Sequence, residues 1–138
     1  MTLPAPAPFD QSKSPFGVVI PFADQLGIKL VEATKDRAVV SLTRTPAISN
    51  SLGTMHGGAI MTMLDLVMSI AVRGFYGVSA GVITIDMSVS FIRPCEGTVL
   101  AIGRVLNGGK SMCFCEGEAT DESGKLLAKT MGTFRLMI

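Results

Sequence analysis

The spacing of hydrophobic residues changes near the middle of the chain. Between Gly57 and about Tyr76, apolar residues occupy most sides of a helical wheel, and no proline interrupts them. This pattern predicts one long, covered helix that ends at the glycines 74 and 77. Residues 83–91, within the stretch 81–94, instead alternate between apolar and polar, which predicts a strand. One face of that strand would carry Ile83, Ile85, Met87, Val89 and Phe91, and the other Thr84, Asp86, Ser88 and Ser90.

Weaker patterns surround these two elements. A short helix is expected from Phe16, with Pro21 inside it and a stop at Gly27. Residues 28–45 read as two strands around a polar turn at Lys35–Asp36. Three further strands are expected at 98–106, 111–120 and 126–137, and the turns before them predict that the last four strands are antiparallel neighbours. The fold class is therefore α+β: an antiparallel sheet of about five to six strands on one long helix. Residues 1–15 are expected to be a proline-rich flexible leader, and residues 16–138 a single domain.

The composition of the chain indicates which classes of partner to expect. Only 17% of the residues are charged, 48% are hydrophobic and the net charge is +1, so we expect part of the surface to be covered in a homo-oligomer. The sequence has no long basic run, so nucleic-acid binding is not predicted. Neither a membrane span nor a signal peptide is evident. Cys95, Cys113 and Cys115 read as reduced thiols of a cytoplasmic protein. With a single histidine, no metal site is predicted.

The long helix carries one polar stripe, and it begins with an unusual sequence. Thr62, Asp65, Ser69 and Arg73 fall within about a quarter of the helix circumference. This stripe is either the solvent-facing edge of a core helix or part of a site. The helix begins with His56-Gly57-Gly58, where partner-free N–H groups could hold a developing oxyanion against Gly57. Alternatively, the glycines permit a tight entry into the helix, and the histidine is structural.

A larger pattern joins these features. Asn50-x-x-Gly53-x-x-His56-Gly57-Gly58, followed by Asp65 in the helix, resembles the hotdog-fold thioesterases of the phenylacetate-pathway type. Residues 83–110 and 117–134 are similar to later strands and turns of that family, so the resemblance spans roughly residues 26–134. It implies a hotdog fold, a homodimer that can pair further into a homotetramer, and an acyl-CoA substrate without a cofactor.

The resemblance also implies roles for individual residues. Asp65 would activate water or attack the thioester directly, and the Gly57 N–H of the other subunit would bind the thioester oxygen. Asn50 would position the site or the water, His56 would orient the motif, and Thr84 would orient the water near the carboxylate. These five residues are the expected catalytic set.

Further residues are candidates for binding the substrate, and two other functions fit the same sequence. Gly58 and Thr62 are expected to line the substrate site, and Arg93 and Lys110 to bind the phosphates of coenzyme A, with Arg73 and Arg104 as further candidates. Each cation could equally be an ordinary solvated surface charge. The alternative functions are a hotdog hydratase or dehydratase acting on acyl thioesters, and an acyl-CoA-binding sensor without enzyme activity.

Overall fold

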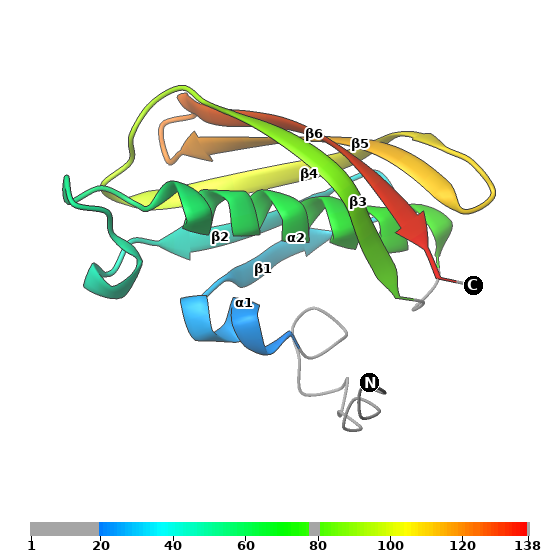
Figure 1. Ribbon diagram of the computed structural model, residues 1–138, viewed down its shortest axis with the longest axis horizontal. Coiled ribbons are helices and arrows are strands. Elements are labelled where there is room, and N and C mark those ends of the chain that lie inside the picture. The colour runs from blue at the N-terminus through cyan, green and yellow to red at the C-terminus, as the bar shows by residue number, and fades with distance from the viewer. Residues whose placement is uncertain (1–19, 78–80, 138) are drawn as a thin grey trace, which may run out of the picture.

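The computed structural model describes residues 20–77 and 81–137. The expected leader 1–15 and the first residues of the expected N-terminal helix, including Phe16, lie outside them. The elements are α1 (Pro21–Leu26), β1 (Lys29–Ala33), β2 (Ala38–Thr43), a short 3-10 turn (Pro46–Ile48), α2 (Gly57–Tyr76), β3 (Val82–Phe91), β4 (Thr98–Gly108), β5 (Met112–Asp121) and β6 (Leu126–Leu136). Figure 1 shows them along the chain.

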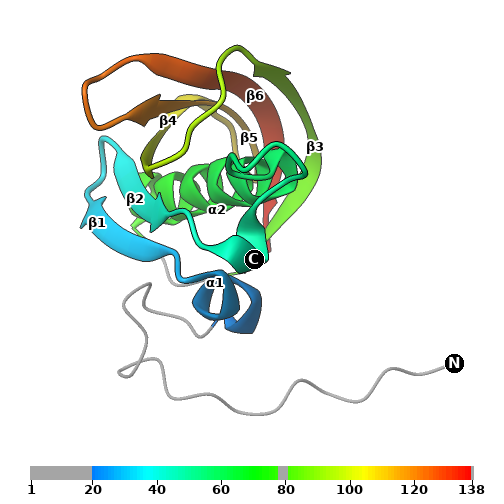
Figure 2. The ribbon, with the colours of Figure 1, turned by 90° about the vertical axis from the view of Figure 1, so that its left-hand side faces the viewer.

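One antiparallel sheet wraps around the long helix. The strands are ordered β1-β2-β4-β5-β6-β3, and Figure 2, turned by 90° from Figure 1, shows them curving around α2. This is the α+β hotdog fold, and the expected six-stranded sheet on one long helix is confirmed. By length and composition α2 could also cross a membrane, but it is the core helix of the sheet and more than half of its apolar window is buried.

The order of the last strands differs from the prediction. β3 pairs with β6 and not with β4, although β3 and β4 are consecutive in the chain. Residues 92–97 carry the chain past the end of β6, because the N–H groups of Ile92 and Arg93 both donate to the Leu127 carbonyl. The N–H of Met55 then donates to the Cys95 carbonyl, so this connection also anchors the loop before α2. The expectation that all four strands are sequential neighbours is therefore wrong at this connection.

The limits of both helices follow from particular glycines and one proline. Gly77 ends α2 in the left-handed region with φ 67°, and its N–H donates to the carbonyls of Arg73 and Gly74. Gly74 lies within the helix and does not end it. A side chain there would collide with the Thr34 carbonyl. Pro21 occupies the first position of α1, where a missing N–H costs nothing, and so it starts that helix instead of breaking it.

The helix lies unusually close to the sheet. A Cβ atom on Gly103 of β4 would come within 2.7 Å of the Val67 carbonyl oxygen in α2, so only glycine permits this approach. The facing helix residues are buried, among them Met63, Leu64, Val67 and Met68. This close packing fixes α2 on the concave face of the sheet and leaves the stripe of Thr62, Asp65, Ser69 and Arg73 half-exposed.

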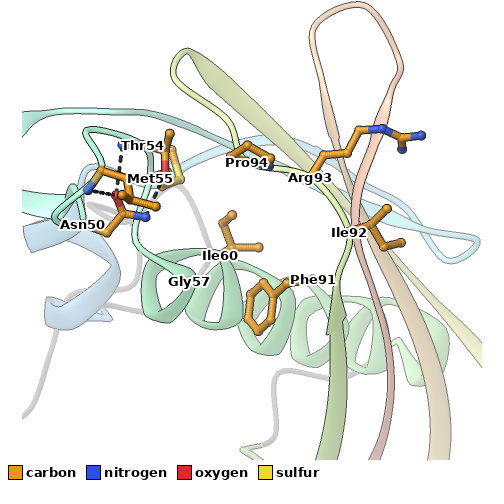
Figure 3. Close-up of a pocket in the computed structure, with 10 residues that line it drawn as sticks. Asn50, Thr54, Met55, Gly57, Ile60, Phe91, Ile92, Arg93 and Pro94 are labelled. Carbon is orange, nitrogen blue, oxygen red and sulfur yellow. Dashed lines mark hydrogen bonds between the residues drawn. The ribbon is translucent and has the colours of Figure 1, made fainter.

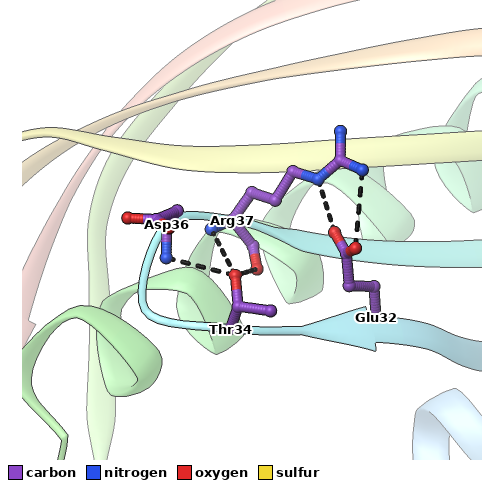
Figure 4. A network of polar contacts seen from close by, with 4 residues as sticks. All are labelled: Glu32, Thr34, Asp36 and Arg37. Atoms are coloured by element: carbon purple, nitrogen blue, oxygen red, sulfur yellow. Dashed lines mark hydrogen bonds and ion pairs between the residues drawn. The ribbon is translucent and has the colours of Figure 1, made fainter.

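The turn between β1 and β2 lies where the sequence predicts it. The Thr34 hydroxyl accepts hydrogen bonds from the N–H groups of Asp36 and Arg37, both at 3.2 Å. The Arg37 guanidinium folds back onto the Glu32 carboxylate of β1 (Figure 4). Because this pair is exposed, we assign it a local role in closing the hairpin.

A β-bulge in β3 changes which residues face the helix. Thr84 pairs with Phe134 and Asp86 with the next residue, Thr133, so Ile85 has no partner on β6. Because an extra residue inverts the alternation, Thr84 shares the helix-facing side with Met87, which packs against the core. The expectation that Thr84 lies on the face opposite Met87 is therefore wrong.

Candidate active site

The first turn of α2 presents one free backbone N–H. The Gly58 N–H donates to Nδ1 of His56 at 2.8 Å, and the N–H groups of Ala59 and Ile60 donate to the His56 carbonyl at 2.9 and 3.3 Å. Among the described residues, only the Gly57 N–H of this turn is left without a partner. It lies at the positive end of the helix dipole, where an oxyanion is stabilised.

His56 explains why the next glycines are needed. Its Nδ1 accepts a hydrogen bond, so the neutral ring carries its proton on Nε2. A Cβ atom on Gly58 would lie 2.9 Å from that Nδ1 and would push the ring off the helix end. His56 thus acts here as the N-cap of α2. Because its ring accepts the Gly58 N–H, the Gly57 N–H is the one in this turn left without a partner among the described residues. The orienting role toward substrate chemistry that the resemblance implies for His56 stays a prediction.

Asp65 and Thr84 lie side by side. The Thr84 hydroxyl donates a hydrogen bond to Oδ1 of Asp65 at 2.6 Å, and Asp65 itself is half-buried. The bulge in β3 makes this contact possible because it turns Thr84 toward the helix. One carboxylate oxygen is therefore oriented by Thr84, while the other has no partner within the described chain and can accept a proton.

The other hydroxyls of the polar stripe are bonded within the helix. The Thr62 hydroxyl donates to the Gly58 carbonyl and the Ser69 hydroxyl to the Leu66 carbonyl, each at 2.8 Å. Gly58 and Thr62, both expected to contact substrate, line one small cavity of about 180 Å³ together with His56 and Phe22 of α1. The cavity lies beside the helix start, on the α1 side.

Asn50 is engaged within its own loop. Its side-chain oxygen accepts from the N–H groups of Leu52 and Thr54 at 2.9 and 3.1 Å, and its amide donates to the Thr54 hydroxyl at 2.8 Å. These contacts hold the loop before α2 in shape, and they leave one amide hydrogen over. Sequence reasoning gave Asn50 a role toward substrate or water and missed this local one, although Asn often closes such turns.

A largely apolar cavity of about 310 Å³ opens beside Gly57. Figure 3 shows it between the loop of Asn50 and Thr54, the start of α2, and the end of β3. Its walls are Leu52, Met55, Ile60, Phe91, Ile92 and Pro94, with Asn50, Thr54, Gly57 and Arg93. Phe91 was not predicted as a site residue. Its ring lies 3.4 Å from where a Cβ atom of Gly57 would be. Phe91 reaches Gly57 only because β3 folds against the start of α2 in the sheet. No local sequence signal therefore places Phe91 in this cavity.

The two expected phosphate-binding residues are far apart in one chain. Arg93 lies beside the start of α2, where Figure 3 shows its side chain extending away from the cavity, and one guanidinium nitrogen donates to the Leu126 carbonyl at 2.7 Å. Lys110 follows Gly109, whose carbonyl accepts from the hydroxyl of Tyr76, the last residue of α2, at 2.6 Å. One subunit therefore does not bring these two cations to the same ligand group.

Gly57 and Asp65 are also separated within the chain. Eight residues of α-helix correspond to about 12 Å along the axis. An oxyanion donor and a base that act on one carbonyl must each lie about 3 Å from the reacting atoms. One copy of the chain therefore contains both a hydrogen-bond donor and a carboxylate, but the two lie too far apart to act on the same carbonyl group.

Comparison with known proteins finds relatives that are similar in sequence and solved structures that are similar in fold. Acyl-coenzyme A thioesterase 13 of Homo sapiens is 28% identical over 116 residues, covering 79% of this chain and 79% of the relative. A conserved protein from Pseudomonas aeruginosa superposes with a TM-score of 0.82 at 28% identity, over 86% of this chain and 95% of that one. The PaaI protein from the phenylacetic acid degradation operon of E. coli shares the fold, with a TM-score of 0.77 at 22% identity, over 85% and 84%.

The family assignment rests on the segment that contains the site. Residues 52–128, more than half of the 138-residue chain, match the family model of the thioesterase superfamily. This segment begins just before the capped glycine helix start and includes Asp65 and Thr84. The chain belongs to the thioesterase superfamily.

Proposed function

We propose that the protein is an acyl-CoA thioesterase that hydrolyses its substrate to a carboxylic acid and coenzyme A. The observation that carries the proposal is the pair of groups on α2: a partner-free N–H at Gly57 and a carboxylate at Asp65 oriented by Thr84. The similarity to acyl-coenzyme A thioesterase 13 supports a coenzyme A thioester as substrate.

The chemistry needs only these two groups and a water molecule. The thioester oxygen accepts the Gly57 N–H, so negative charge that develops on it is stabilised. Asp65 removes a proton from water as the water attacks the carbonyl carbon, and the tetrahedral intermediate expels the coenzyme A thiolate, which takes up a proton. In the alternative mechanism Asp65 attacks first and water hydrolyses the resulting anhydride. Incorporation of labelled oxygen into Asp65 in a single turnover distinguishes the two.

The active site is shared between two subunits of a homodimer in this proposal. β3 lies at the edge of the sheet, and its outer side pairs with no strand of the described chain. Ile83, Ile85 and Phe91 on β3 are exposed apolar residues, which a second copy would cover. Antiparallel pairing of two β3 edges places the two α2 helices side by side, so Gly57 of one subunit can face Asp65 of the other. Further pairing would give a homotetramer.

The remaining residues have supporting roles in the same scheme. His56 holds the helix end so that the Gly57 N–H stays free, and the spare amide hydrogen of Asn50 can bind the thioester oxygen or the water. Gly58 and Thr62 line the approach to the site, while Arg93 and Lys110 would bind coenzyme A phosphates from different subunits. We place the enzyme in the cytoplasm, which is consistent with its three free, buried cysteines.

The direct test measures thiol release from short, medium, long and aromatic acyl-CoA thioesters. We expect hydrolysis of at least one class, and we expect Asp65→Asn to lower kcat by at least about 100-fold because it removes the base while keeping the size. Undiminished hydrolysis by Asp65→Asn contradicts the role of Asp65. Tight acyl-CoA binding without thiol release favours the sensor, and water addition to an enoyl thioester favours the hydratase.

A further inference from the structure

Arg73 is a half-buried cation that nothing in the described chain neutralises. It lies in the last turn of α2, and its guanidinium makes no hydrogen bond or ion pair with another described residue. The ion pairs of the described residues belong to Arg37 and Lys129. Burial lowers the pKa of Arg73 from its ordinary value because desolvation disfavours the charged form. A desolvated cation without a partner is costly, and this cost is offset if an anion binds there.

Arg73 shares its helix face with Asp65. The two residues are eight positions apart, which is about 12 Å along the axis, and Ser69 lies between them on the same stripe. The hydroxyl of Ser69 bonds back to the helix and adds no charge. A substrate that extends from Asp65 toward the C-terminal end of α2 therefore passes one small polar residue and then meets Arg73.

The proposed dimer leaves this end of the stripe open to substrate. This step rests on the proposed function, in which Gly57 of one subunit faces Asp65 of the other. Consider two antiparallel α2 helices that are related by a twofold axis, with Gly57 of one level with Asp65 of the other. The axis then passes at the level of Met61, midway between Gly57 and Asp65. Arg73 then lies about 18 Å from the axis level but Gly57 of the other helix only about 6 Å from it. Arg73 thus projects about 12 Å past the start of that helix, beyond the reacting thioester and on the side toward which the acyl group can extend.

We propose that Arg73 is a specificity residue that binds a carboxylate at the far end of the acyl group. The preferred substrate class is then a medium-chain dicarboxylic acid held as its mono-thioester, because the separation of about 12 Å suits a chain of that size. Arginine binds carboxylates in a bidentate manner, which selects them over an uncharged methyl end.

Two other roles are possible for a cation at this position, and each makes a different prediction. As a charge at the C-terminal end of a helix, Arg73 would stabilise the fold whatever the substrate. As a ligand of coenzyme A phosphate, it would matter equally for every acyl-CoA. The dicarboxylate role alone ties Arg73 to the free end of the acyl chain.

The experiment compares matched substrates and matched variants. Adipyl- and suberyl-CoA are measured against hexanoyl- and octanoyl-CoA, which have the same chain lengths but a methyl end. The corresponding pantetheine thioesters, which lack the nucleotide phosphates, are measured alongside them. The variants are Arg73→Gln, Arg73→Lys and, as a matched loss of one exposed charge, Lys125→Gln in the β5–β6 turn. Thermal unfolding of each variant is recorded in the absence of substrate.

We expect the wild type to prefer the dicarboxylate thioesters and Arg73→Gln to lower their kcat/KM by about tenfold or more. The methyl-ended thioesters should stay within about twofold, Arg73→Lys should keep part of the preference, and Lys125→Gln should keep all of it. An equal loss for all CoA thioesters but not for the pantetheine thioesters would assign Arg73 to the phosphates and overturn the proposal. A lower melting temperature with an unchanged substrate preference would overturn it as well. Hydrolysis of no thioester by the wild type would instead contradict the proposed function itself.

Discussion

At the residue scale, the backbone N–H of Gly57 can be removed without disturbing the helix. Gly57 is the first residue of α2, a position that accepts proline. His56 has φ −61° and ψ 136°, which is the extended conformation that a residue before proline requires. Gly57→Ala would add a Cβ atom at an ordinary contact distance of 3.4 Å from Phe91 and keep the N–H. The two variants therefore differ chiefly in the hydrogen-bond donor.

We expect Gly57→Pro to lower kcat by about 100-fold to 1,000-fold, which is typical for the loss of one oxyanion donor. Gly57→Ala should retain most of the wild-type rate, since its N–H is present. Steady-state hydrolysis of the best acyl-CoA gives both numbers, and circular dichroism checks that helix content is unchanged. Equal losses in the two variants would mean that crowding near Phe91, and not the N–H, limits the reaction.

Thr84 gives a second prediction at this scale. Thr84→Val keeps the shape of the side chain but removes the hydroxyl that orients Oδ1 of Asp65. We expect kcat to fall about tenfold, in line with a hydrogen bond to a charged group, while KM stays nearly constant. Thr84→Ser should retain most of the activity. Because Thr84 is exposed in the single chain, melting temperatures should hardly change, and an unchanged kcat in Thr84→Val would refute the orienting role.

At the scale of elements, the long helix and strand β3 were both predictable, but the face that β3 turns toward the helix was not. The limits of α2 follow from local signals: an unbroken apolar run, a histidine and glycines at its start, and Gly77 at its end. The face of β3 depends instead on its pairing with β6, where one extra residue inverts the alternation. A regular period of two contains no sign of such a bulge. For the same reason the sequence names Thr84 as a site residue through the family pattern but assigns it to the wrong side.

The crossing of the chain between β3 and β4 is a similar case. The turn residues of 92–97 suggest a short connection, and short connections usually join neighbouring strands. Here the connection is held by the carbonyl of Leu127 and by the loop before α2, which lie far from it in sequence. This arrangement leaves β3 at the sheet edge, where a second subunit could pair with it.

Strand β5 carries a prediction about pH. Cys113 and Cys115 are fully buried with their sulfur atoms 3.7 Å apart, and burial raises the pKa of both thiols. In the unfolded chain they lose their protons near pH 8.5, whereas in the folded protein they stay protonated. Above that pH the unfolded state binds fewer protons than the native state, so the free energy of unfolding falls as the pH rises.

We therefore expect thermal unfolding under reducing conditions to shift to lower temperature between pH 7.5 and pH 9.5. The double variant Cys113→Ala, Cys115→Ala should be less stable overall, because it leaves a cavity, but its melting temperature should vary less with pH over this range. Parallel pH profiles for the variant and the wild type would show that these thiols do not cause the dependence.

At the scale of the whole molecule, one chain contains the candidate site residues but does not bring Gly57 and Asp65 together. The sequence names Gly57 and Asp65 as candidates because both belong to the pattern that resembles the family. It does not reveal their separation of about 12 Å, since that follows from both residues lying on one straight helix. The positions of Arg93 and Lys110, at opposite ends of α2, make the same point. The proposed homodimer would account for both separations together.

Mixing two inactive variants shows whether Gly57 of one subunit acts with Asp65 of the other. Subunits with Asp65→Asn and subunits with Gly57→Pro carry different affinity tags, and the heterodimer is purified through both. One of its two sites then contains an intact Gly57 and an intact Asp65, while the other site lacks both. We predict about half of the wild-type kcat per dimer, from two parents that are each nearly inactive. A heterodimer as inactive as its parents would contradict the shared site.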